Sequence, residues 1–411
     1  MRTEGFRSFA RTLLFLAATL ILGQPIRAQH IVPRLPSLSE VGDNPISFMR
    51  PHHVIYTQAG SSVSGPPSSA FTPRQIRHAY GFDQITNQGS GQVIGIVDAY
   101  DDPNIQADLS VFSKQFGLPP CTTSNGCFRE VFERSRPNAN ANWAIEIALD
   151  VEWAHAIAPQ ATIVLVEVSS NSLNDLLAGV DIAVRSGASV VSMSWLAGEF
   201  SGERNQDNHF ASNDVAFLAA SGDNGTGTAY PAASPGVIGV GGTSLTLDSQ
   251  GNYLTEIAWS GSGGGRSAYE HEPLYQALFG IPDDPSGVRG IPDVSYNGDP
   301  GTGIAIYDSV ALNGSAGWFQ IGGTSAGTPQ WAALIAVANS MRAAERKANL
   351  SSTNSALYSL AKAAMGSDFH PVTKGTNGAC GTICDALPGY DYVTGLGTPK
   401  AAALIPALVA H

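Results

Sequence analysis

The chain has 411 residues, of which 43% are hydrophobic and only 14% are charged, so it can bury a large core. Its formal net charge is -12 at pH 7, and an acidic chain repels phosphate backbones. The charge therefore argues against nucleic acid as a partner. The 45 Gly and 25 Pro show no fixed period, which argues against collagen, solenoid and coiled-coil architectures.

Residues 1–28 have the features of a signal peptide. Arg2, Arg7 and Arg11 precede an apolar run at 13–22, and Ala28 is a small residue at a cleavage point. A membrane anchor is the alternative, but about ten apolar residues cannot cross a bilayer core that needs roughly 20. We expect a protein secreted or otherwise exported from the cytoplasm, with no membrane partner, and a monomer.

The segment that follows, residues 29–70, is rich in Pro, Ser, His and Gly and lacks helical or strand periodicity. It is expected to be a flexible leader or a short propeptide before a domain that spans residues 71–411.

Within this domain, stretches typical of strands alternate with stretches typical of helices. Strands are expected at 93–97, 162–168, 189–194, 215–220 and 237–240, and helical segments at 105–116, 142–158 and 172–185. This alternation predicts an α/β fold with a mostly parallel central sheet and helices on both faces. Ligands of such folds gather at the carboxyl ends of the strands.

The four cysteines form two close pairs, Cys121/Cys127 and Cys380/Cys384. In an exported protein such pairs favour two short disulfides that clip loops. The alternative is a metal site built from all four thiolates. It is less favoured, because paired ligands in such sites usually lie two to four residues apart and the first pair is wider.

The helix expected at 142–158 carries two acids on one face. Glu146 and Asp150 are four residues apart, and their neighbours are apolar nearly all round the helix, so the helix is expected to be buried. Two buried like charges are costly unless they share a proton, which suggests chemistry. A solvent-facing acidic stripe is the alternative. His155 lies on the opposite side of the helix and is expected to be a structural partner.

Asp223 follows directly on the strand expected at 215–220. Gly222 and Gly225 flank it, and glycine permits close approach of the backbone to a ligand. An ordinary turn aspartate is the alternative.

Ser325 lies in a Gly-Gly-Thr-Ser-Ala-Gly-Thr-Pro segment at 322–329, which predicts a tight turn that opens a helix through Ala344. A serine in the first turn of a helix lies near unpaired N–H groups, which suits an attacking oxygen; a serine N-cap is the alternative. A nucleophilic serine needs a base, and none of the nine histidines lies in a Gly-His-Gly-Thr context of the kind subtilisin-like enzymes use.

In this order, the Glu-x-x-x-Asp helix, the Ser-Gly-Asp turn and the Gly-Thr-Ser-Ala turn resemble the sedolisin (serine-carboxyl peptidase) family. The resemblance extends from about Phe71 to the C-terminus, with supporting segments at 71–77, 155–159, 230–233, 240–245, 263–265, 291–295 and 389–395. It implies a subtilisin-like fold and hydrolysis of peptide bonds, in protein or peptide substrates, through an acyl-enzyme.

The resemblance also implies residue roles. Ser325 would attack, Glu146 would take its proton and Asp150 would orient Glu146. Asp223 would donate a hydrogen bond to the oxyanion. The substrate cleft is expected to involve Trp195, Gly263, Gly264 and Gly265.

The expected role of Asp223 sets a pH range, because only a protonated carboxyl can donate a hydrogen bond. With an ordinary pKa near 3.9, roughly one molecule in a thousand would be competent at neutral pH. Unless burial raises that pKa strongly, activity should rise below about pH 5.

Two features depart from the family pattern. Members usually carry a long folded propeptide, whereas only about 42 residues lie between the predicted cleavage site and Phe71. The family's C-terminal calcium site has a carboxylate where this chain has Pro371. The remaining candidate calcium ligands are Val372, Leu387, Gly389 and Asp391, and calcium needs six or more oxygens.

Two other functions compete with this one. The segment 323–327 fits the G-x-S-x-G elbow of α/β-hydrolase esterases, but that fold needs a later histidine, and only His370 and His411 follow. The second alternative is a peptidase-shaped protein that binds peptides without cutting them. The presence of all four expected catalytic side chains argues against it.

Overall fold

The computed structural model describes residues 1, 48–51, 53–58, 65–282, 287–350 and 352–411. The predicted signal peptide from residue 2 onward, and residues 29–47, 52 and 59–64 of the predicted leader, lie outside the described residues. Among the described residues, no helix combines the length and the apolar character needed to cross a membrane.

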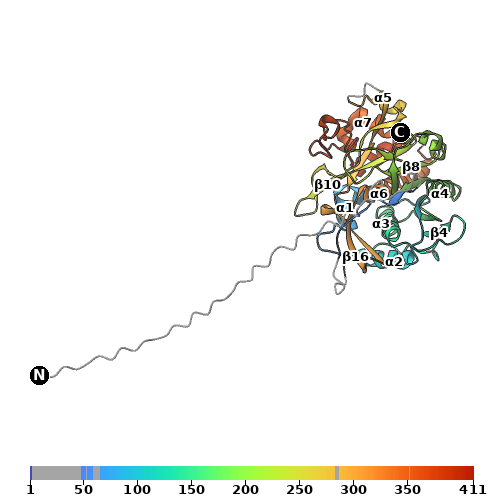
Figure 1. Ribbon diagram of the computed structural model, residues 1–411, viewed down its shortest axis with the longest axis vertical. Coiled ribbons are helices and arrows are strands. Elements are labelled where there is room, and N and C mark those ends of the chain that lie inside the picture. Colours follow the sequence, from blue (N-terminus) through green and yellow to red (C-terminus); the bar gives the residue numbers. More distant parts are fainter. Residues whose placement is uncertain (2–47, 52, 59–64, 283–286, 351) are drawn as a thin grey trace.

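The centre of the molecule is an eight-stranded sheet in the order β11-β10-β8-β6-β3-β5-β4, with β14 also paired to β10 (Figure 1). All pairs are parallel except the β10–β11 pair. The strands are β3 (Val93–Ala99), β4 (Phe128–Phe132), β5 (Thr162–Val168), β6 (Val190–Met193), β8 (Ala216–Ala220), β10 (Val237–Leu247), β11 (Tyr253–Ala258) and β14 (Val294–Asn297). The five strands expected from the sequence are confirmed, as is the mostly parallel sheet.

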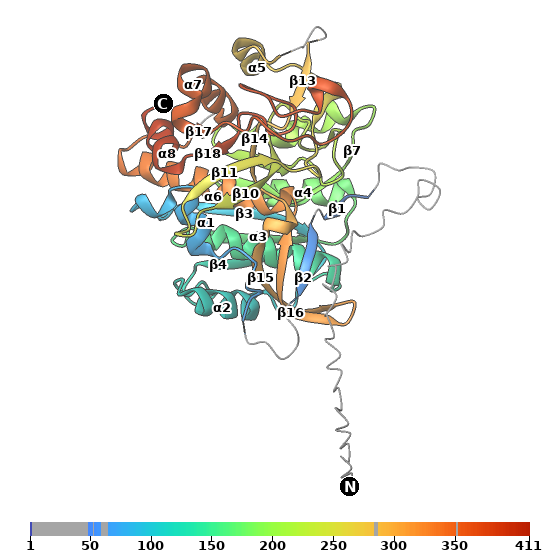
Figure 2. The same ribbon diagram turned by 90° about the vertical axis from the view of Figure 1, so that its left-hand side faces the viewer.

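Helices cover both faces of this sheet. They are α1 (Pro73–Ala79), α2 (Ile105–Phe116), α3 (Ala141–Ile157), α4 (Leu173–Arg185), α5 (Leu274–Phe279), α6 (Thr324–Ala344), α7 (Thr353–Asp368) and α8 (Ala401–Ala410). The helices α3 and α6 pack together on one face, whereas α4 packs on β3 and β5 from the other (Figure 2). The helical segments expected at 105–116, 142–158 and 172–185 correspond to α2, α3 and α4.

The alternation of side chains along the strands builds a separate apolar core on each face. Ile94 and Ile96 of β3 join the core beneath α3 and α6, whereas Val97 joins the core beneath α4. Successive residues of a strand point to opposite faces, so one buried strand serves both layers. The continuous apolar run of β3 follows from this burial on both sides.

Shorter strands surround the central sheet. They are β1 (Arg50–Pro51), β2 (Val54–Gln58), β7 (Trp195–Gly198), β9 (Ala229–Tyr230), β12 (Gly265–His271), β13 (Val288–Ile291), β15 (Ile304–Leu312), β16 (Ser315–Gly322), β17 (Phe369–His370) and β18 (Thr398–Pro399). The strands β15 and β16 form an antiparallel hairpin beside α2 and α3, and β16 leads directly into α6.

The segment 48–58 differs from its sequence-based expectation. It lies within the leader that was expected to lack strands, yet β1 pairs with β7 and β2 pairs with β16 (Figure 2). The hydrogen-bonding partners belong to distant parts of the chain, so the leader's own composition gives no sign of them. We refer to the described residues of 48–58 as the strap.

Two covalent links and one polar network fix the outer loops. Both predicted disulfides, Cys121–Cys127 and Cys380–Cys384, are confirmed.

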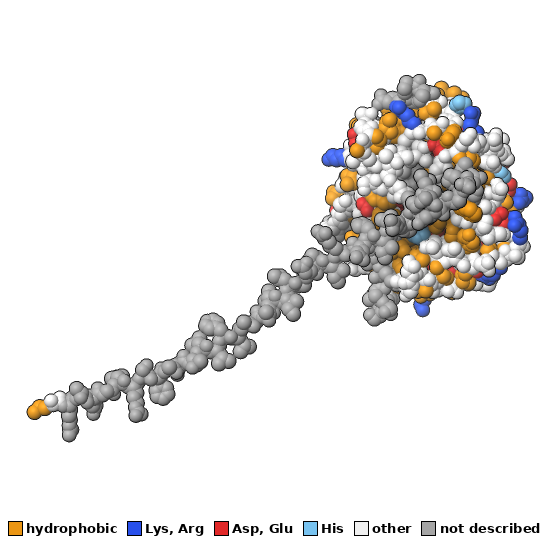
Figure 3. Space-filling model, viewed as in Figure 1, with side chains coloured by type: hydrophobic (Ala, Val, Ile, Leu, Met, Phe, Trp, Pro, Cys, Tyr) orange, Lys and Arg blue, Asp and Glu red, His pale blue; other side chains and the backbone are white. Residues whose placement is uncertain are grey.

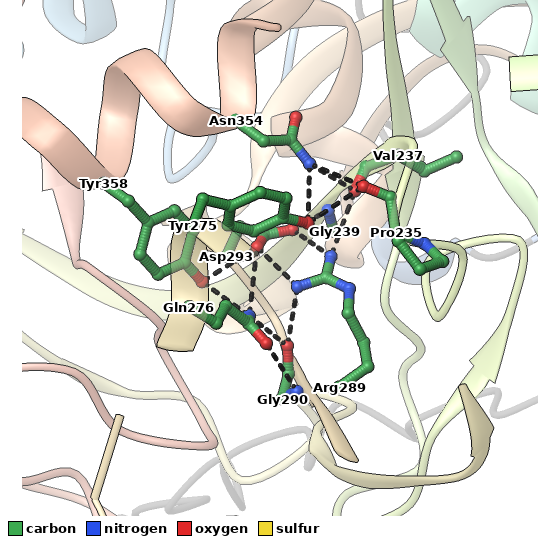
Figure 4. Close-up of polar contacts among 10 residues, drawn as sticks. All are labelled: Pro235, Val237, Gly239, Tyr275, Gln276, Arg289, Gly290, Asp293, Asn354 and Tyr358. Carbon is green, nitrogen blue, oxygen red and sulfur yellow. Dashed lines mark hydrogen bonds and ion pairs between the residues drawn. The ribbon is translucent and has the colours of Figure 1, made fainter. Parts of the chain in front are cut away.

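The polar network joins α5 and α7 to the start of β10 (Figure 4). Arg289 and Asp293 form a fully buried ion pair at 2.5 Å, and Asp293 also accepts hydrogen bonds from Tyr358 Oη at 2.8 Å and from the N–H of Gly239 in β10 at 2.7 Å. Both carboxylate oxygens of Asp293 therefore have partners, and its buried charge is compensated within the fold.

Candidate active site

Helix α3 places Glu146 and Asp150 in the interior of the protein. Asn140 caps the helix by accepting from the N–H groups of Asn142 and Trp143, and every residue from Trp143 to Ile157 is buried. Both acids are 0% exposed, so the solvent-facing acidic stripe is wrong. A helix with apolar residues all round has no wet face on which to place its acids.

Burial and a neighbouring like charge together raise the pKa of Asp150. Burial raises the pKa of this carboxyl well above its usual range, and the carboxylate of Glu146 raises it further. Ser194, just after β6, donates a hydrogen bond to Asp150 Oδ1 at 2.8 Å and partly offsets the rise. Asp150 therefore holds a proton readily, as expected for two acids that share one.

Asp98 is a third buried acid at this site, and the sequence analysis missed it. It lies near the carboxyl end of β3 with 0% exposure, and burial, followed by the charges of Asp150 and Glu146, raises its pKa well above the usual range. Neither of its carboxylate oxygens has a hydrogen-bond partner within the described part of the chain. An acid that follows a buried β-branched run was the available signal, because ligands gather at strand ends.

Asp223 lies in the turn after β8, against the start of α6. Its Oδ1 accepts from the N–H of Thr324 at 2.7 Å and from the Thr324 hydroxyl at 2.9 Å. Burial raises the pKa of Asp223 to about 7, even though these two hydrogen bonds oppose the rise. The charge of Glu146 adds to the rise, which couples the turn of Asp223 electrostatically to α3.

Ser325 is the second residue of α6, as the sequence predicted. Gly323, which precedes the helix, has φ 120°, a conformation that favours glycine and lets β16 turn sharply into α6. Ser325 is 0% exposed, and its Oγ has no hydrogen-bond partner among the described residues, so it does not act as an N-cap here.

A histidine from the strap contacts the candidate base. His53 Nδ1 lies 2.5 Å from Glu146 Oε2, and both side chains are nearly or fully buried. The strap reaches this position because Val54 pairs with Gly322, and Pro51 pairs with Trp195. The imidazole therefore meets the carboxylate rather than the serine hydroxyl.

The four candidate substrate-binding residues are all buried. The indole N–H of Trp195 donates to Val97 O at 2.9 Å, so its side chain enters the sheet core and only its main chain meets the strap. Gly263, Gly264 and Gly265 pack against the 221–228 turn. A Cβ on Gly263 would lie 2.2 Å from the carbonyl oxygen of Ser221, so only glycine permits this approach.

The residues suggested for calcium fit a cation poorly. Asp391 Oδ1 accepts from the N–H groups of Val393 and Thr394, and its Oδ2 accepts from the N–H of Leu387 and the Thr394 hydroxyl. These four donors fill the roughly four lone-pair positions of a carboxylate. Pro371 offers no side-chain oxygen where the family has a carboxylate, and the remaining residues Val372, Leu387 and Gly389 could contribute only main-chain carbonyls.

Two other described histidines, His155 and His370, have partners away from Ser325. His155 Nε2 lies 2.8 Å from Pro119 O, which confirms its structural role, and His370 stacks on Tyr253 with ring centroids 3.8 Å apart. The esterase alternative needs a histidine late in the chain to contact Ser325, and Ser325 Oγ has no such partner in the part of the chain that is described.

A parallel sheet with a buried serine at one helix start and acids on the neighbouring helix defines a subtilisin-like serine peptidase architecture. The sequence model of the subtilase family matches residues 138–367, more than half of the chain. The fold also resembles that of a lanthipeptide protease, with a TM-score of 0.53 at 14% identity over 81% of this chain and 92% of that one.

More specific similarity is to serine-carboxyl peptidases. Kumamolisin of Bacillus sp. (strain MN-32) is 30% identical over 92% of this chain and 71% of its own length. Sedolisin of Pseudomonas sp. (strain 101) is 36% identical over 41% of this chain and 28% of its own length. The structure of Pseudomonas sedolisin complexed with pseudo-iodotyrostatin matches with a TM-score of 0.71 at 25% identity, over 83% of this chain and 98% of that chain. The chain therefore belongs to the sedolisin family of serine-type peptidases, as its motifs predicted.

Proposed function

We propose that the chain is an exported peptidase that cleaves peptide bonds in acid through an acyl-enzyme on Ser325. The observation that carries the proposal is the burial of Glu146 and Asp150 on a helix packed against α6, with no Lys or Arg paired to either acid among the described residues. Buried acids without a permanent counter-charge are poised to exchange protons.

In the proposed reaction, Ser325 Oγ attacks the substrate carbonyl while its proton passes to Glu146. Asp150 holds Glu146 in place and accepts part of the shared proton. Glu146 then returns the proton to the leaving amine. A water molecule hydrolyses the acyl-enzyme with Glu146 again acting as the base.

Asp223, when protonated, donates a hydrogen bond to the oxyanion. The raised pKa of Asp223 widens the pH range in which we expect activity. With a pKa of about 7, half of the molecules carry this proton at neutral pH, rather than one in a thousand. Activity should therefore rise as the pH falls through about 7, not only below about 5.

We also propose that residues 29–70 act as a leader that keeps the enzyme inactive before removal. In support, His53 engages Glu146, and the strap pairs with β7 on one side and β16 on the other. The imidazole occupies Oε2 of Glu146, so it competes with the serine proton for the base, and loss of the strap would accompany activation.

The test is digestion of a denatured protein substrate across pH 3–8, with N-terminal sequencing of the recovered enzyme. Activity should fall towards pH 8, and the recovered chain should begin beyond the strap. The matched Ser325→Ala chain should lose about 10⁶-fold in turnover and keep its strap. Turnover near the wild-type value in this variant would remove Ser325 from the mechanism.

A further inference from the structure

A second group of buried acids lies away from the candidate active site. Asp102 follows β3, Asp108 is on α2, Asp308 is on β15 and Glu152 is on α3, and their exposures are 0%, 2%, 0% and 0%. We call these four residues the buried acid cluster. Its elements pack against one another in the part of the molecule that contains α2 and β15 (Figure 2).

Each of these acids has one carboxylate oxygen fixed by the main chain. Four N–H groups, of Asn104, Ser309, Val310 and Tyr307, donate in turn to Asp102 Oδ1, Asp108 Oδ2, Asp308 Oδ1 and Glu152 Oε2, at 2.7–3.0 Å. Such contacts hold the carboxyl groups in place and leave a second oxygen on each for another partner.

For three of the acids this second oxygen has no partner within the described residues. They are Asp102 Oδ2, Asp308 Oδ2 and Glu152 Oε1, each shielded from solvent. Buried polar atoms nearly always have a partner, and an uncompensated carboxylate oxygen is costly. Two of these oxygens belong to the aspartates whose carboxylates lie close together, and burial and the charges of all three aspartates raise the pKa of the third acid, Glu152. Together they point to a missing positive charge.

A neighbouring trio of acids shows how this protein otherwise handles such a cluster. Asp101, Glu130 and Glu167 also lie close together, but Arg136 Nε lies 2.9 Å from Asp101 and its Nη2 lies 3.1 Å from Glu130. No described Lys, Arg or His forms an ion pair with the buried acid cluster. Burial raises the pKa of Asp308, and the charge of His53 lowers it only slightly. The buried acid cluster therefore gathers carboxyl groups as the trio does, but it has no counterpart of Arg136.

The spacing suits one ion. One carboxylate oxygen from each of Asp102, Asp108 and Asp308 lies within 4.8 Å of the others. With calcium–oxygen distances of about 2.4 Å, two ligands on opposite sides of the ion lie about 4.8 Å apart. The donors are all oxygen, which favours calcium or magnesium over zinc or copper.

We propose that the buried acid cluster is a binding site for a divalent cation of the size of calcium. The ion would join the loop after β3 to α2 and β15, beside the helix that carries Glu146 and Asp150. Its ligands come from separate elements, so binding would stabilise the fold. The site is distinct from the 371–391 loop, whose Asp391 is already fully hydrogen-bonded.

The competing explanation is that protons alone neutralise the cluster. Burial raises the pKa of Asp102 to about 8 and that of Asp308 to about 7, so without an ion these carboxyls hold protons near neutral pH. An experiment with added calcium separates the two explanations.

The test uses the full-length Ser325→Ala chain, which cannot digest itself, after dialysis against a chelator at pH 7.0. Adding 1 mM calcium chloride should raise Tm by roughly 5 °C, and about one calcium per chain should remain after gel filtration, measured by atomic emission. Asp102→Asn with Asp308→Asn should abolish both effects, because it removes two charges while preserving size.

Two matched variants test whether calcium binds at another acidic site instead. Glu130→Gln alters the Arg136-covered trio and Asp391→Asn alters the C-terminal loop, and both should retain the calcium response. A Ser325→Ala chain with an intact cluster that holds no calcium, or a response that survives Asp102→Asn with Asp308→Asn, would overturn the site. If that double variant does not fold, a terbium peak at the cluster in crystals of the Ser325→Ala chain supports the proposal, and its absence there refutes it.

Discussion

Two buried charged groups in this protein are built in opposite ways. In the Arg289–Asp293 network, an acid meets a guanidinium and two further donors, so its charge is compensated within the fold. In the site on α3, Glu146 and Asp150 face each other and Asp98 without a Lys or Arg partner among the described residues. A compensated buried charge supports structure, whereas an uncompensated one can move protons.

Glu146→Gln tests most directly whether the uncompensated acids on α3 are catalytic. If Glu146 is the base, the loss of its carboxylate should lower kcat/KM about 10²–10⁴-fold at pH 5, because a positioned base contributes about that much. Peptide hydrolysis by the strap-free enzyme measures this. Asp181→Asn, which changes a half-buried carboxylate on α4 that pairs with His209, is the control and should keep normal activity. Unchanged proteolysis by Glu146→Gln would end the assignment.

If the Arg289–Asp293 network is structural, breaking it should destabilise the protein. Asp293→Asn leaves Arg289 buried without its counter-charge and should lower the free energy of unfolding by about 3–5 kcal/mol. Urea denaturation of the Ser325→Ala chain provides the measurement. Arg134→Met removes a 68% exposed arginine from its ion pairs with Glu133 and Asp175 and should cost less than about 1 kcal/mol. Equal losses in the two variants would contradict the view that the network is structural.

The pH profile tests Asp223. Its proton is lost as the pH rises through about 7, so wild-type activity should fall about tenfold per pH unit well above that value. In Asp223→Asn, the amide N–H donates at every pH, so this fall should disappear while the maximal kcat decreases. A profile with the same alkaline fall in both enzymes would assign the titration to another group.

The smallest expected effect concerns the strap. His53→Ala removes the contact with Glu146, and the loss of this hydrogen bond should raise the initial rate of the freshly purified full-length chain by roughly tenfold. His78→Ala, which alters an exposed histidine paired with Asp83, should leave that rate unchanged. An initial rate that His53→Ala does not raise would show that the imidazole does not restrain the base.

The face of the molecule in Figure 3 shows Lys and Arg side chains interspersed among other types, rather than gathered in one broad patch. That distribution agrees with the sequence-based expectation of protein or peptide substrates rather than nucleic acid, which stays a prediction.

Local sequence patterns determined much of this protein. The apolar run of β3, the apolar surroundings of Glu146 and the Gly-Thr-Ser turn before α6 depend on neighbours within one or two turns of chain. Periodicity and composition record such short-range constraints. The α/β fold, both disulfides and the four candidate catalytic positions could therefore be predicted from the sequence, whereas the order of the strands in the sheet could not.

Only the tertiary structure decided which buried acids have partners. Nothing near His53 in the sequence points to Glu146, 93 residues away, and nothing near Asp308 distinguishes it from the compensated Asp293. Burial and electrostatic coupling depend on what distant elements bring within a few ångströms. For the same reason, the raised pKa of Asp223 and the cation site proposed at Asp102, Asp108 and Asp308 became visible only once the chain was folded.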